Sequence, residues 1–176
     1  MVDFDKTLTP GDIEDGIVNV VVEIPAGSID KVEWHREKTD FELDRVEPLK
    51  FTEPSNYGFI PHTLNEDGNE LDALIISEES MPTGAISKAK IIGIMKFDDE
   101  GETDDKIIVV PVDDINNGSA IKILSDIPKQ KIDQITNYFT HYKDMIKPNS
   151  TIVKGWGDIS EAKDIIYKSI ELWEKQ

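Results

Sequence analysis

Short hydrophobic or alternating runs, separated by turn residues, make up the first two thirds of the chain. Residues 17–24 are mostly β-branched and are followed by Pro25, a pattern that predicts a buried strand and its exit turn. In residues 31–35 polar and apolar side chains alternate, which is typical of a strand with one polar face. The same reasoning predicts strands at residues 41–44, 72–77, 84–97, 106–112 and 151–156. The run 84–97 is long enough for one strand or for two strands bent at Gly93.

Two later segments have the spacing of amphipathic helices. The first begins near Pro128 and is closed by Pro148, and its apolar residues recur every three or four positions. These apolar residues are Ile132, Ile135, Phe139, Tyr142 and Ile146. The second helix begins at Asp158, which forms a capping-box pattern with Glu161. Its inner face is predicted to carry Ile159, Ala162, Ile166 and Trp173, with Ile165 and Ile170 beside them.

This order of elements predicts an α+β protein that is mainly β. The strands are too short and too numerous for a helical bundle, and a small closed or partly closed barrel with helices packed outside it fits them best. A chain of 176 residues, 38% of them hydrophobic, has the length of one ordinary domain. We therefore assign residues 1–176 to a single domain.

Charge and composition exclude several classes of protein. The chain carries 36 acidic and 19 basic side chains, a net charge of −17, which argues against a nucleic-acid partner. It has no cysteine, so disulfides, thiolate metal sites and cysteine nucleophiles are impossible. No apolar run approaches the ~20 residues of a membrane-spanning helix, and the acidic start lacks the order of a secretory signal. We therefore expect a cytoplasmic protein with no membrane partner.

Two acidic stretches differ from the rest of the acidic surface because each leads directly into a predicted strand. Residues 66–72 and residues 98–106 place several carboxylates on turns at the ends of strands. Carboxylate and water oxygens are the ligands that Mg²⁺ and Ca²⁺ prefer. Neither stretch has the glycine and glutamate positions of an EF-hand loop. On this pattern alone, a metal site and an ordinary polar turn both remain open.

Basic and hydroxyl side chains occur within or next to the same predicted elements. They are Lys31, Arg45, Lys106, Tyr142 and Lys143. Taken singly, each is ordinary, because core tyrosines are common and lysines often lay their stems along apolar surface. Together with the two carboxylate turns, they would form a site for a small, highly charged anion held by metal ions.

In order along the chain, these residues resemble the motifs of the soluble family I inorganic pyrophosphatases. The resemblance extends from Val20 to the final helix and rests on seven segments in register. The segments are Val22-Glu23-Ile24-Pro25, Lys31-Val32-Glu33, Asp44-Arg45, Asn56-Tyr57-Gly58-Phe59-Ile60-Pro61, Asp67-Gly68-Asn69-Glu70-Leu71-Asp72, Asp99 with Asp104 and Lys106, and His141-Tyr142-Lys143. The fifth segment corresponds to the family signature Asp-x-Asp-Pro/Glu-x-Asp.

The resemblance implies hydrolysis of inorganic diphosphate to two orthophosphates by a metal-activated water. It also implies a five-stranded, OB-like closed barrel flanked by two C-terminal helices. The implied cofactor is Mg²⁺, bound as several ions, with Mn²⁺ or another divalent ion as a substitute. The short chain resembles prokaryotic members of the family, which are commonly homohexamers.

Carried over position by position, the resemblance implies a role for each matching residue. The implied metal ligands are Asp67, Asp72, Asp99 and Asp104. The implied contacts to phosphate oxygens are Lys31, Arg45, Tyr57, Lys106, Tyr142 and Lys143, of which Lys31, Arg45 and Tyr57 are also assigned a catalytic part. Glu23 and Glu33 are implied to line the cavity and to act through metal-bound water.

The signature departs from the family at its middle position, where Asn69 stands in place of an aspartate. The family assigns the general base to this position, and an amide accepts a hydrogen bond but not a proton. General-base help is typically worth ~10²–10⁴ in rate, so we expect reduced turnover with binding retained. The alternative is a diphosphate- and metal-binding protein that has lost catalysis. A second departure is Glu53, where many bacterial relatives carry an aromatic residue.

The remaining aromatic and imidazole side chains have simpler interpretations. An OB-like nucleic-acid module is disfavoured because the chain is acidic and only 7% aromatic. His35 and His62 are expected to be surface or supporting groups, since hard cations prefer oxygen. His141 is expected to point away from the inner face of its helix. The tryptophans are expected in the core or in subunit contacts; they are Trp34, Trp156 and Trp173.

Overall fold

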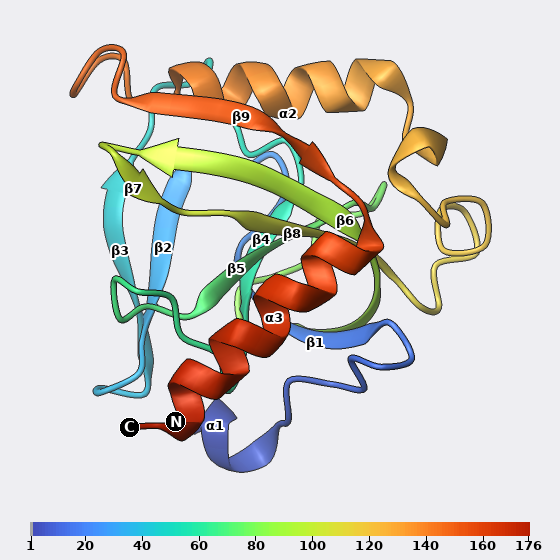
Figure 1. The fold of residues 1–176 in the computed structure, drawn as a ribbon. Helices are drawn as coiled ribbons and strands as arrows, with labels where there is room; N and C mark the ends of the chain where they lie inside the picture. The colour runs from blue at the N-terminus through green and yellow to red at the C-terminus, as the bar shows by residue number, and fades with distance from the viewer. Residues whose placement is uncertain (1) are drawn as a thin grey trace.

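The computed structural model describes residues 2–176 of the chain. Its centre is a closed barrel of five strands (Figure 1): β1 (Ile17–Ile24), β4 (Asn56–Ile60), β5 (Leu71–Ile75), β8 (Lys106–Pro111) and β6 (Ile86–Asp99). The barrel closes because β1 pairs with β4 on one side and with β6 on the other. The expected barrel, mainly β and flanked by helices, is therefore confirmed.

One strand pair in the barrel is parallel. β5 and β8 run in the same direction, with Asp72 opposite Lys106, whereas the other barrel pairs are antiparallel. A parallel pair needs a crossover instead of a hairpin, and the chain crosses over through β6 and the short β7 (Glu102–Thr103). The acidic turns that precede β5 and β8 therefore lie at the same end of the barrel.

β6 is one continuous strand of 14 residues. Its register against β8 shifts between Ile91 and Gly93, so the bend expected at Gly93 is a bulge within a single strand. A Cβ atom at Gly93 would lie 2.6 Å from the carbonyl oxygen of Gly157 and 2.6 Å from Leu124 Cγ. Glycine at this position therefore allows β6 to pair with β8 on one edge and with β9 (Thr151–Gly157) on the other.

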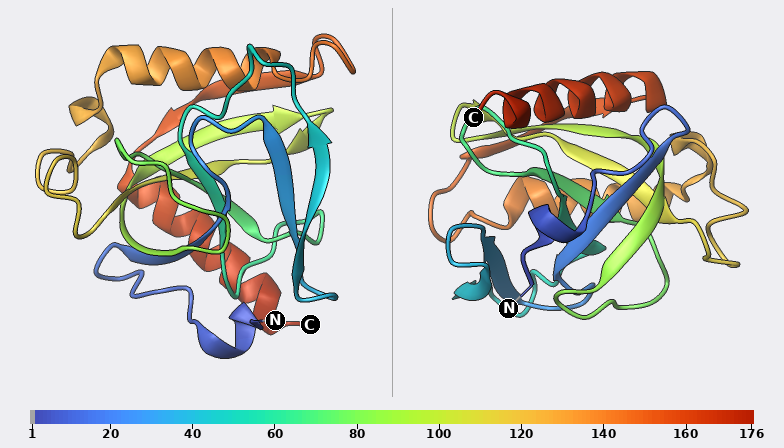
Figure 2. Two further views of the ribbon diagram at one scale, coloured as in Figure 1. Left: turned by 180° about the vertical axis from the view of Figure 1, so that it is seen from behind. Right: turned by 90° about the horizontal axis from the view of Figure 1, so that it is seen from below.

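Two helices and a hairpin surround the barrel (Figures 1 and 2). α3 (Ile159–Glu174) packs across β6, and α2 (Lys129–His141) packs along β9. β2 (Asp30–His35) and β3 (Asp40–Val46) form a separate two-stranded sheet at one side of the barrel. The sequence did not predict the short helix α1 (Phe4–Thr7) or the 3₁₀ turn η1 (Leu124–Asp126). Within the described residues, no helix has the length and apolar content needed to cross a bilayer.

The hydrophobic core has contributions from every strand of the barrel. Its main cluster takes side chains from all five strands and continues to Ala162 and Ile166 on the inner face of α3. A second cluster joins β6 to α2 and includes Phe97 and Phe139. A third, aromatic cluster attaches α1 and the hairpin to the barrel and includes Trp34, which is 9% exposed. Of the two places expected for the tryptophans, the core or a subunit contact, Trp34 therefore lies in the core.

The predicted strands and helices are present, but α2 ends earlier than expected. Tyr142 caps α2 and Lys143 lies beyond it, whereas the sequence pattern placed both in the middle of a helix. The hydroxyl of Thr151 donates to the carbonyl oxygens of Phe139 and Thr140, at 2.8 and 3.1 Å. These carbonyls are the acceptors that another helical turn would use, so the contact from β9 ends the helix.

α3 begins with the capping box that the sequence predicts, which gives a test of the fold. Asp158 Oδ1 accepts from the Glu161 N–H, and Glu161 Oε2 accepts from the Asp158 N–H, both at 2.9 Å. Asp158→Ala should lower the free energy of unfolding by about 1 kcal/mol because it removes this acceptor. Asp158→Asn should retain most of the stability. Denaturant unfolding measures both, and Ser160→Ala in the same turn is the control; equal midpoints for Asp158→Ala and Ser160→Ala would contradict the prediction.

Candidate active site

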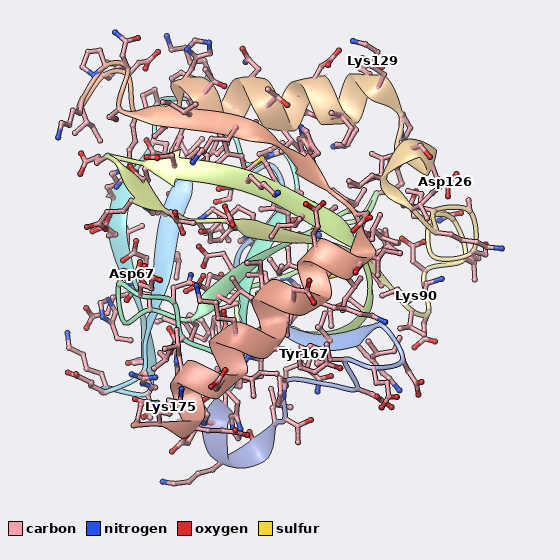
Figure 3. All side chains as sticks on the ribbon, in the orientation of Figure 1. Asp67, Lys90, Asp126, Lys129, Tyr167 and Lys175 are labelled. Atoms are coloured by element: carbon pink, nitrogen blue, oxygen red, sulfur yellow. The ribbon has the colours of Figure 1, made fainter. Side chains whose placement is uncertain are left out.

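A cavity of about 230 Å³ opens at the end of the barrel where the two acidic turns lie. Among the residues that the sequence singles out, it is lined by Glu23, Lys31, Glu33, Tyr57, Asp67, Asn69, Asp72, Asp99 and Asp104. We refer to four of them, Asp67, Asp72, Asp99 and Asp104, as the aspartate cluster. Figure 3 labels Asp67 on the turn that faces the β2–β3 side of the barrel. Residues far apart in the chain therefore meet in one polar cavity.

Strand register explains part of this convergence. Phe59 of β4 pairs with Asp72 of β5, and Asp72 pairs in turn with Lys106 of β8. Directly paired residues place their side chains on the same face of a sheet. Tyr57 lies two residues from Phe59 and shares that face. The register by itself therefore collects a phenol, a carboxylate and an ammonium group.

Glu23 reaches the cavity at an irregularity of β1. The register of β1 against β4 shifts between Val22 and Ile24, and such bulges redirect the side chain at the shift. The carboxylate of Glu23 accepts a hydrogen bond from the backbone N–H of Trp34 at 2.8 Å, which ties β1 to β2. Burial, with a further contribution from the charge of Asp72, raises the pKa of Glu23 well above its ordinary value.

Lys106 is a buried cation, 2% exposed, in the middle of the site. Its Nζ donates to Asp72 Oδ2 at 2.6 Å, to Asp104 Oδ2 at 2.7 Å and to the hydroxyl of Tyr57 at 3.1 Å. Burial alone would lower the pKa of Lys106, but the two carboxylates outweigh burial and raise it, so the ammonium stays protonated. Burial raises the pKa of Asp104 to about 7; Lys106 opposes this rise and Asp72 adds to it.

The end of α2 brings two more predicted residues to the site. Lys143 Nζ donates to Asp99 Oδ2 at 2.5 Å. The other oxygen, Asp99 Oδ1, is buried and has no hydrogen-bond partner among the described residues. Tyr142 is buried, and burial raises the pKa of its hydroxyl although Lys106 opposes the rise. The Tyr142 hydroxyl therefore keeps its proton and remains a donor.

The β2–β3 hairpin contributes Lys31 and Arg45, which are cross-strand partners. Lys31 lines the cavity, and its Nζ lies 3.3 Å from Glu33 Oε1. Arg45 lies beside Lys31 but does not line the cavity; its Nε donates to Glu47 at 2.7 Å and its Nη1 to Asp44 at 3.1 Å. Lys106, Tyr142 and Lys143 are likewise outside the set of lining residues.

Internal hydrogen bonds hold the signature turn in place. Asp67 accepts from the backbone N–H of Asn69 at 2.9 Å and from its side-chain amide at 3.3 Å. Gly68 between them has a φ of +85°, a conformation that favours glycine. The backbone N–H of Asn65 donates to the carbonyl oxygen of Asn69 at 2.7 Å and closes the turn. Asn69 therefore faces the cavity next to Asp67.

Sequence reasoning did not assign several residues of the cavity wall to the site. Ile24, Val32, Trp34 and Phe59 form its apolar part, and the rings of Trp34 and Phe59 stack with centroids 6.0 Å apart. Glu70 also lines the cavity and lies 3.9 Å from Arg36, and burial raises its pKa to about 7. Apolar residues give no chemical signal in a sequence, but the carboxylate of Glu70 within the signature was a signal that could have been used.

The aspartate cluster has the donor atoms that suit a hard divalent cation. Mg²⁺ prefers carboxylate oxygens, and the buried Asp99 Oδ1 has no donor of its own. As the side chains stand in residues 2–176, no three histidine, aspartate or glutamate side chains form a set that could hold a metal ion. The ammonium groups of Lys106 and Lys143 pair instead with three members of the cluster. The aspartate cluster therefore has the right donor atoms for a divalent cation. A bound cation would compete with these lysines for the same carboxylate oxygens.

Comparison with known proteins gives the same result from sequence and from structure. Residues 20–174 match the family model described as inorganic pyrophosphatase. The chain is 57% identical over 176 residues to an inorganic pyrophosphatase of Neisseria meningitidis serogroup B, covering 100% of this chain and 99% of the relative. It is 53% identical to an inorganic pyrophosphatase of Haemophilus influenzae, covering 100% of both chains.

Solved structures share the whole fold. The crystal structure of an inorganic pyrophosphatase from Neisseria gonorrhoeae is 56% identical, with a TM-score of 0.95, and the match covers 98% of this chain and 99% of that one. An inorganic pyrophosphatase from Thermus thermophilus is 32% identical, with a TM-score of 0.88 and coverage of 95% and 97%. Together with the cavity and its carboxylates, these matches show that the chain belongs to the inorganic pyrophosphatase family.

Proposed function

We propose that this chain hydrolyses inorganic diphosphate to two orthophosphates in the cavity lined by the aspartate cluster. The proposed cofactor is Mg²⁺, bound as several ions, and Mn²⁺ or another divalent ion would replace it. The observation that carries the proposal is that carboxylates from two acidic turns line one cavity together with Lys31, and that Lys106 pairs with two of these carboxylates. Membership of the inorganic pyrophosphatase family supports the same reaction.

The proposed task of the chain's own donors is to neutralise the substrate. Diphosphate is a poor electrophile because its negative charge repels a nucleophile, so donors must hold its oxygens and stabilise the charge on the leaving phosphate. The proposed donors are Lys31, Arg45, Lys106 and Lys143 as cations, and Tyr57 and Tyr142 as hydroxyls. Burial raises the pKa of Tyr57 well above its ordinary value, so this hydroxyl also keeps its proton. Lys31, Arg45 and Tyr57 are proposed to act on the reacting phosphate.

The aspartate cluster is the proposed holder of the cations, and Glu23 and Glu33 are proposed to act at the cavity edge through water. A bound divalent cation would supply positive charge beside the substrate and would acidify the attacking water. The chain's part is to keep these carboxylates together, and Lys106 does so for Asp72 and Asp104 by donating a hydrogen bond to each. Because Lys106 keeps its proton, it is able to exchange a carboxylate partner for a phosphate oxygen.

Asn69 occupies the position proposed for the general base. Its side-chain oxygen accepts a hydrogen bond from water but takes no proton, so the chain itself removes none at this position. We propose that binding is retained and that turnover is lowered. Asn69 also favours a second candidate, a diphosphate- and metal-binding protein that no longer catalyses hydrolysis. Only the first candidate releases orthophosphate over multiple turnovers.

We also propose that the chain works in the cytoplasm as a homo-oligomer, as a hexamer by resemblance to prokaryotic members of the family. Several large apolar side chains are exposed on the single chain, among them Leu49, Ile115 and Met145. Contacts between subunits would remove such side chains from water, which supports an assembly without specifying its size.

Removal of divalent cations tests the proposed cofactor. Release of orthophosphate from diphosphate should fall at least about a hundredfold in excess EDTA, because the loss of cation charge costs several kcal/mol of transition-state stabilisation. Excess Mg²⁺ should restore the rate. Circular dichroism in EDTA is the control for folding, and an undiminished rate with the cations removed would refute the proposed metal dependence.

Restoring a carboxylate at position 69 tests the proposed base. Asn69→Asp should raise kcat for diphosphate hydrolysis by about 10²–10⁴, the usual size of general-base help. Asn65→Asp makes the same chemical change in the same turn, outside the cavity wall, and is the matched control. Rates for the parent chain and Asn69→Asp that agree within about threefold would mean that position 69 is not the base in this chain. Multiple turnovers by the parent chain itself would exclude the second candidate.

A further inference from the structure

Two buried carboxyl groups outside the cavity wall have no part in the chemistry described so far. Glu47 and Glu53 are each 6% exposed. Backbone hydrogen bonds fix both, since the Glu47 N–H donates to the Ile29 carbonyl at 2.7 Å and the Glu53 N–H to the Ser28 carbonyl at 2.9 Å. The segment between β3 and β4 is therefore docked on the loop that leads into β2. Buried carboxyl groups are costly and need a structural or functional reason.

Glu47 forms an ion pair with one edge of the Arg45 guanidinium group. The Glu47 carboxylate accepts from Arg45 Nε at 2.7 Å, and the Glu47 side chain is only 4% exposed. Asp44 accepts from Nη1 at 3.1 Å. The remaining nitrogen, Arg45 Nη2, is buried and has no hydrogen-bond partner among the described residues. The ion pair therefore fixes the plane of the guanidinium group and leaves the two N–H groups of Nη2 without a partner among the described residues.

Glu53 supports Tyr142 through a second tyrosine. The hydroxyl of Tyr138 donates to Glu53 Oε1 at 3.0 Å, and the pair is buried. The ring of Tyr138 stacks on that of Tyr142, with centroids 5.2 Å apart and planes 16° apart. Burial raises the pKa of Tyr138, and the nearby Glu53 and the charge of Glu47 raise it further, so the Tyr138 hydroxyl keeps its proton. We call Glu47, Glu53 and Tyr138 the support cluster.

We propose that the support cluster positions two substrate donors: Glu47 orients Arg45, and Glu53 orients Tyr142 through Tyr138. This inference rests on the proposed function, because it assumes that Arg45 and Tyr142 bind phosphate oxygens. Long side chains lose rotamer freedom when they bind a ligand, and a buried partner removes that freedom before the ligand arrives. The support cluster would therefore tighten binding without touching the substrate.

Protonation of Glu53 gives a separate test of its buried position. Burial raises the pKa of Glu53 to about 8, although Tyr138 and the charges of Lys106 and Lys31 lower it and Glu47 raises it again. A carboxyl group whose pKa is higher in the folded state contributes stability at low pH and loses it as the pH rises through the folded value. Glu53→Gln mimics the protonated form and does not lose this stability. The difference in thermal midpoint, Glu53→Gln minus parent, should therefore increase from pH 6 to pH 9.

Thermal unfolding of both proteins at several pH values measures this gain. Glu171→Gln, which changes an exposed carboxylate on α3, is the control and should give no pH-dependent difference. A constant difference in midpoint between Glu53→Gln and the parent from pH 6 to pH 9 would contradict the assignment of a raised pKa to Glu53.

Double-mutant cycles test the positioning itself, with methylenediphosphonate as a non-hydrolysable probe. Its Kd is measured by calorimetry in excess Mg²⁺, so the result does not depend on turnover. Glu47→Ala should weaken binding about tenfold in the parent chain. In an Arg45→Ala background the same change should weaken binding less than about twofold, because Glu47 acts on the ligand only by orienting Arg45. Glu47→Gln keeps an acceptor for Arg45 Nε and should recover most of the affinity. If Glu47→Ala does not fold, Glu47→Leu, which keeps a side chain of similar size but offers Arg45 no acceptor, takes its place in the cycle.

The second cycle uses Tyr138 and Tyr142. Tyr138→Phe keeps the stacked ring but removes the bond to Glu53, and it should weaken binding about threefold in the parent but not in a Tyr142→Phe background. Tyr167→Phe changes an exposed tyrosine on α3 and is the control. If Tyr138→Phe weakens binding equally in the parent and in the Tyr142→Phe background, the positioning role is wrong while the proposed function still stands. If Arg45→Ala and Tyr142→Phe leave the Kd unchanged, the proposed roles of these donors are wrong and the inference falls with them.

Discussion

The geometry of the site depends on the hydrogen bonds that the Lys106 ammonium group donates to Asp72 and Asp104. Lys106 lies at the start of β8, opposite Asp72 in the parallel register with β5, and it bridges Asp72 and Asp104. Two carboxylates buried this close would repel each other without a cation between them, and a single buried ammonium would be equally costly alone. The closed barrel fixes the register of β5 and β8. It therefore also fixes the positions of Asp72 and Lys106 relative to each other.

The distribution of charge follows from the same constraint. The chain as a whole is strongly acidic, with a net charge of −17, yet lysine ammonium groups lie among the carboxylates of the cavity. Lys106 and Lys143 each pair with members of the aspartate cluster, and Lys31 pairs with Glu33. A site of this kind is suited to a ligand that carries many negative charges only if further cations accompany that ligand. Under the proposed function, the lysines would supply donors and the carboxylates would hold the cations.

Under the proposed function, the amide at position 69 would separate binding from chemistry in this chain. The turn that carries Asn69 is well formed, since Asp67 and Asn65 hydrogen-bond to it on both sides. Under the proposed function, a change in turnover would therefore belong to proton transfer, because Asn69 and Asp67 both line the cavity.

Most of the strands, the capping box of α3 and the segments that resemble the family were readable in the sequence, because each depends on residues close together in the chain. The barrel strand β4 was recognised only as one of those segments and not as a strand. Those segments also located the aspartate cluster, since residue type and spacing are local properties. The early end of α2 could not be predicted from the sequence, because it depends on Thr151 of β9, which is distant in the chain. The Thr151 hydroxyl donates to the backbone carbonyls of the last helical turn. The helix therefore stops before Ile146, and this side chain is exposed. The burial of Glu47 and Glu53 and their bonds to Arg45 and Tyr138 were equally hidden. An isolated glutamate in a sequence resembles any surface carboxylate, and only the packing of distant segments decides whether water or a neighbouring side chain surrounds it.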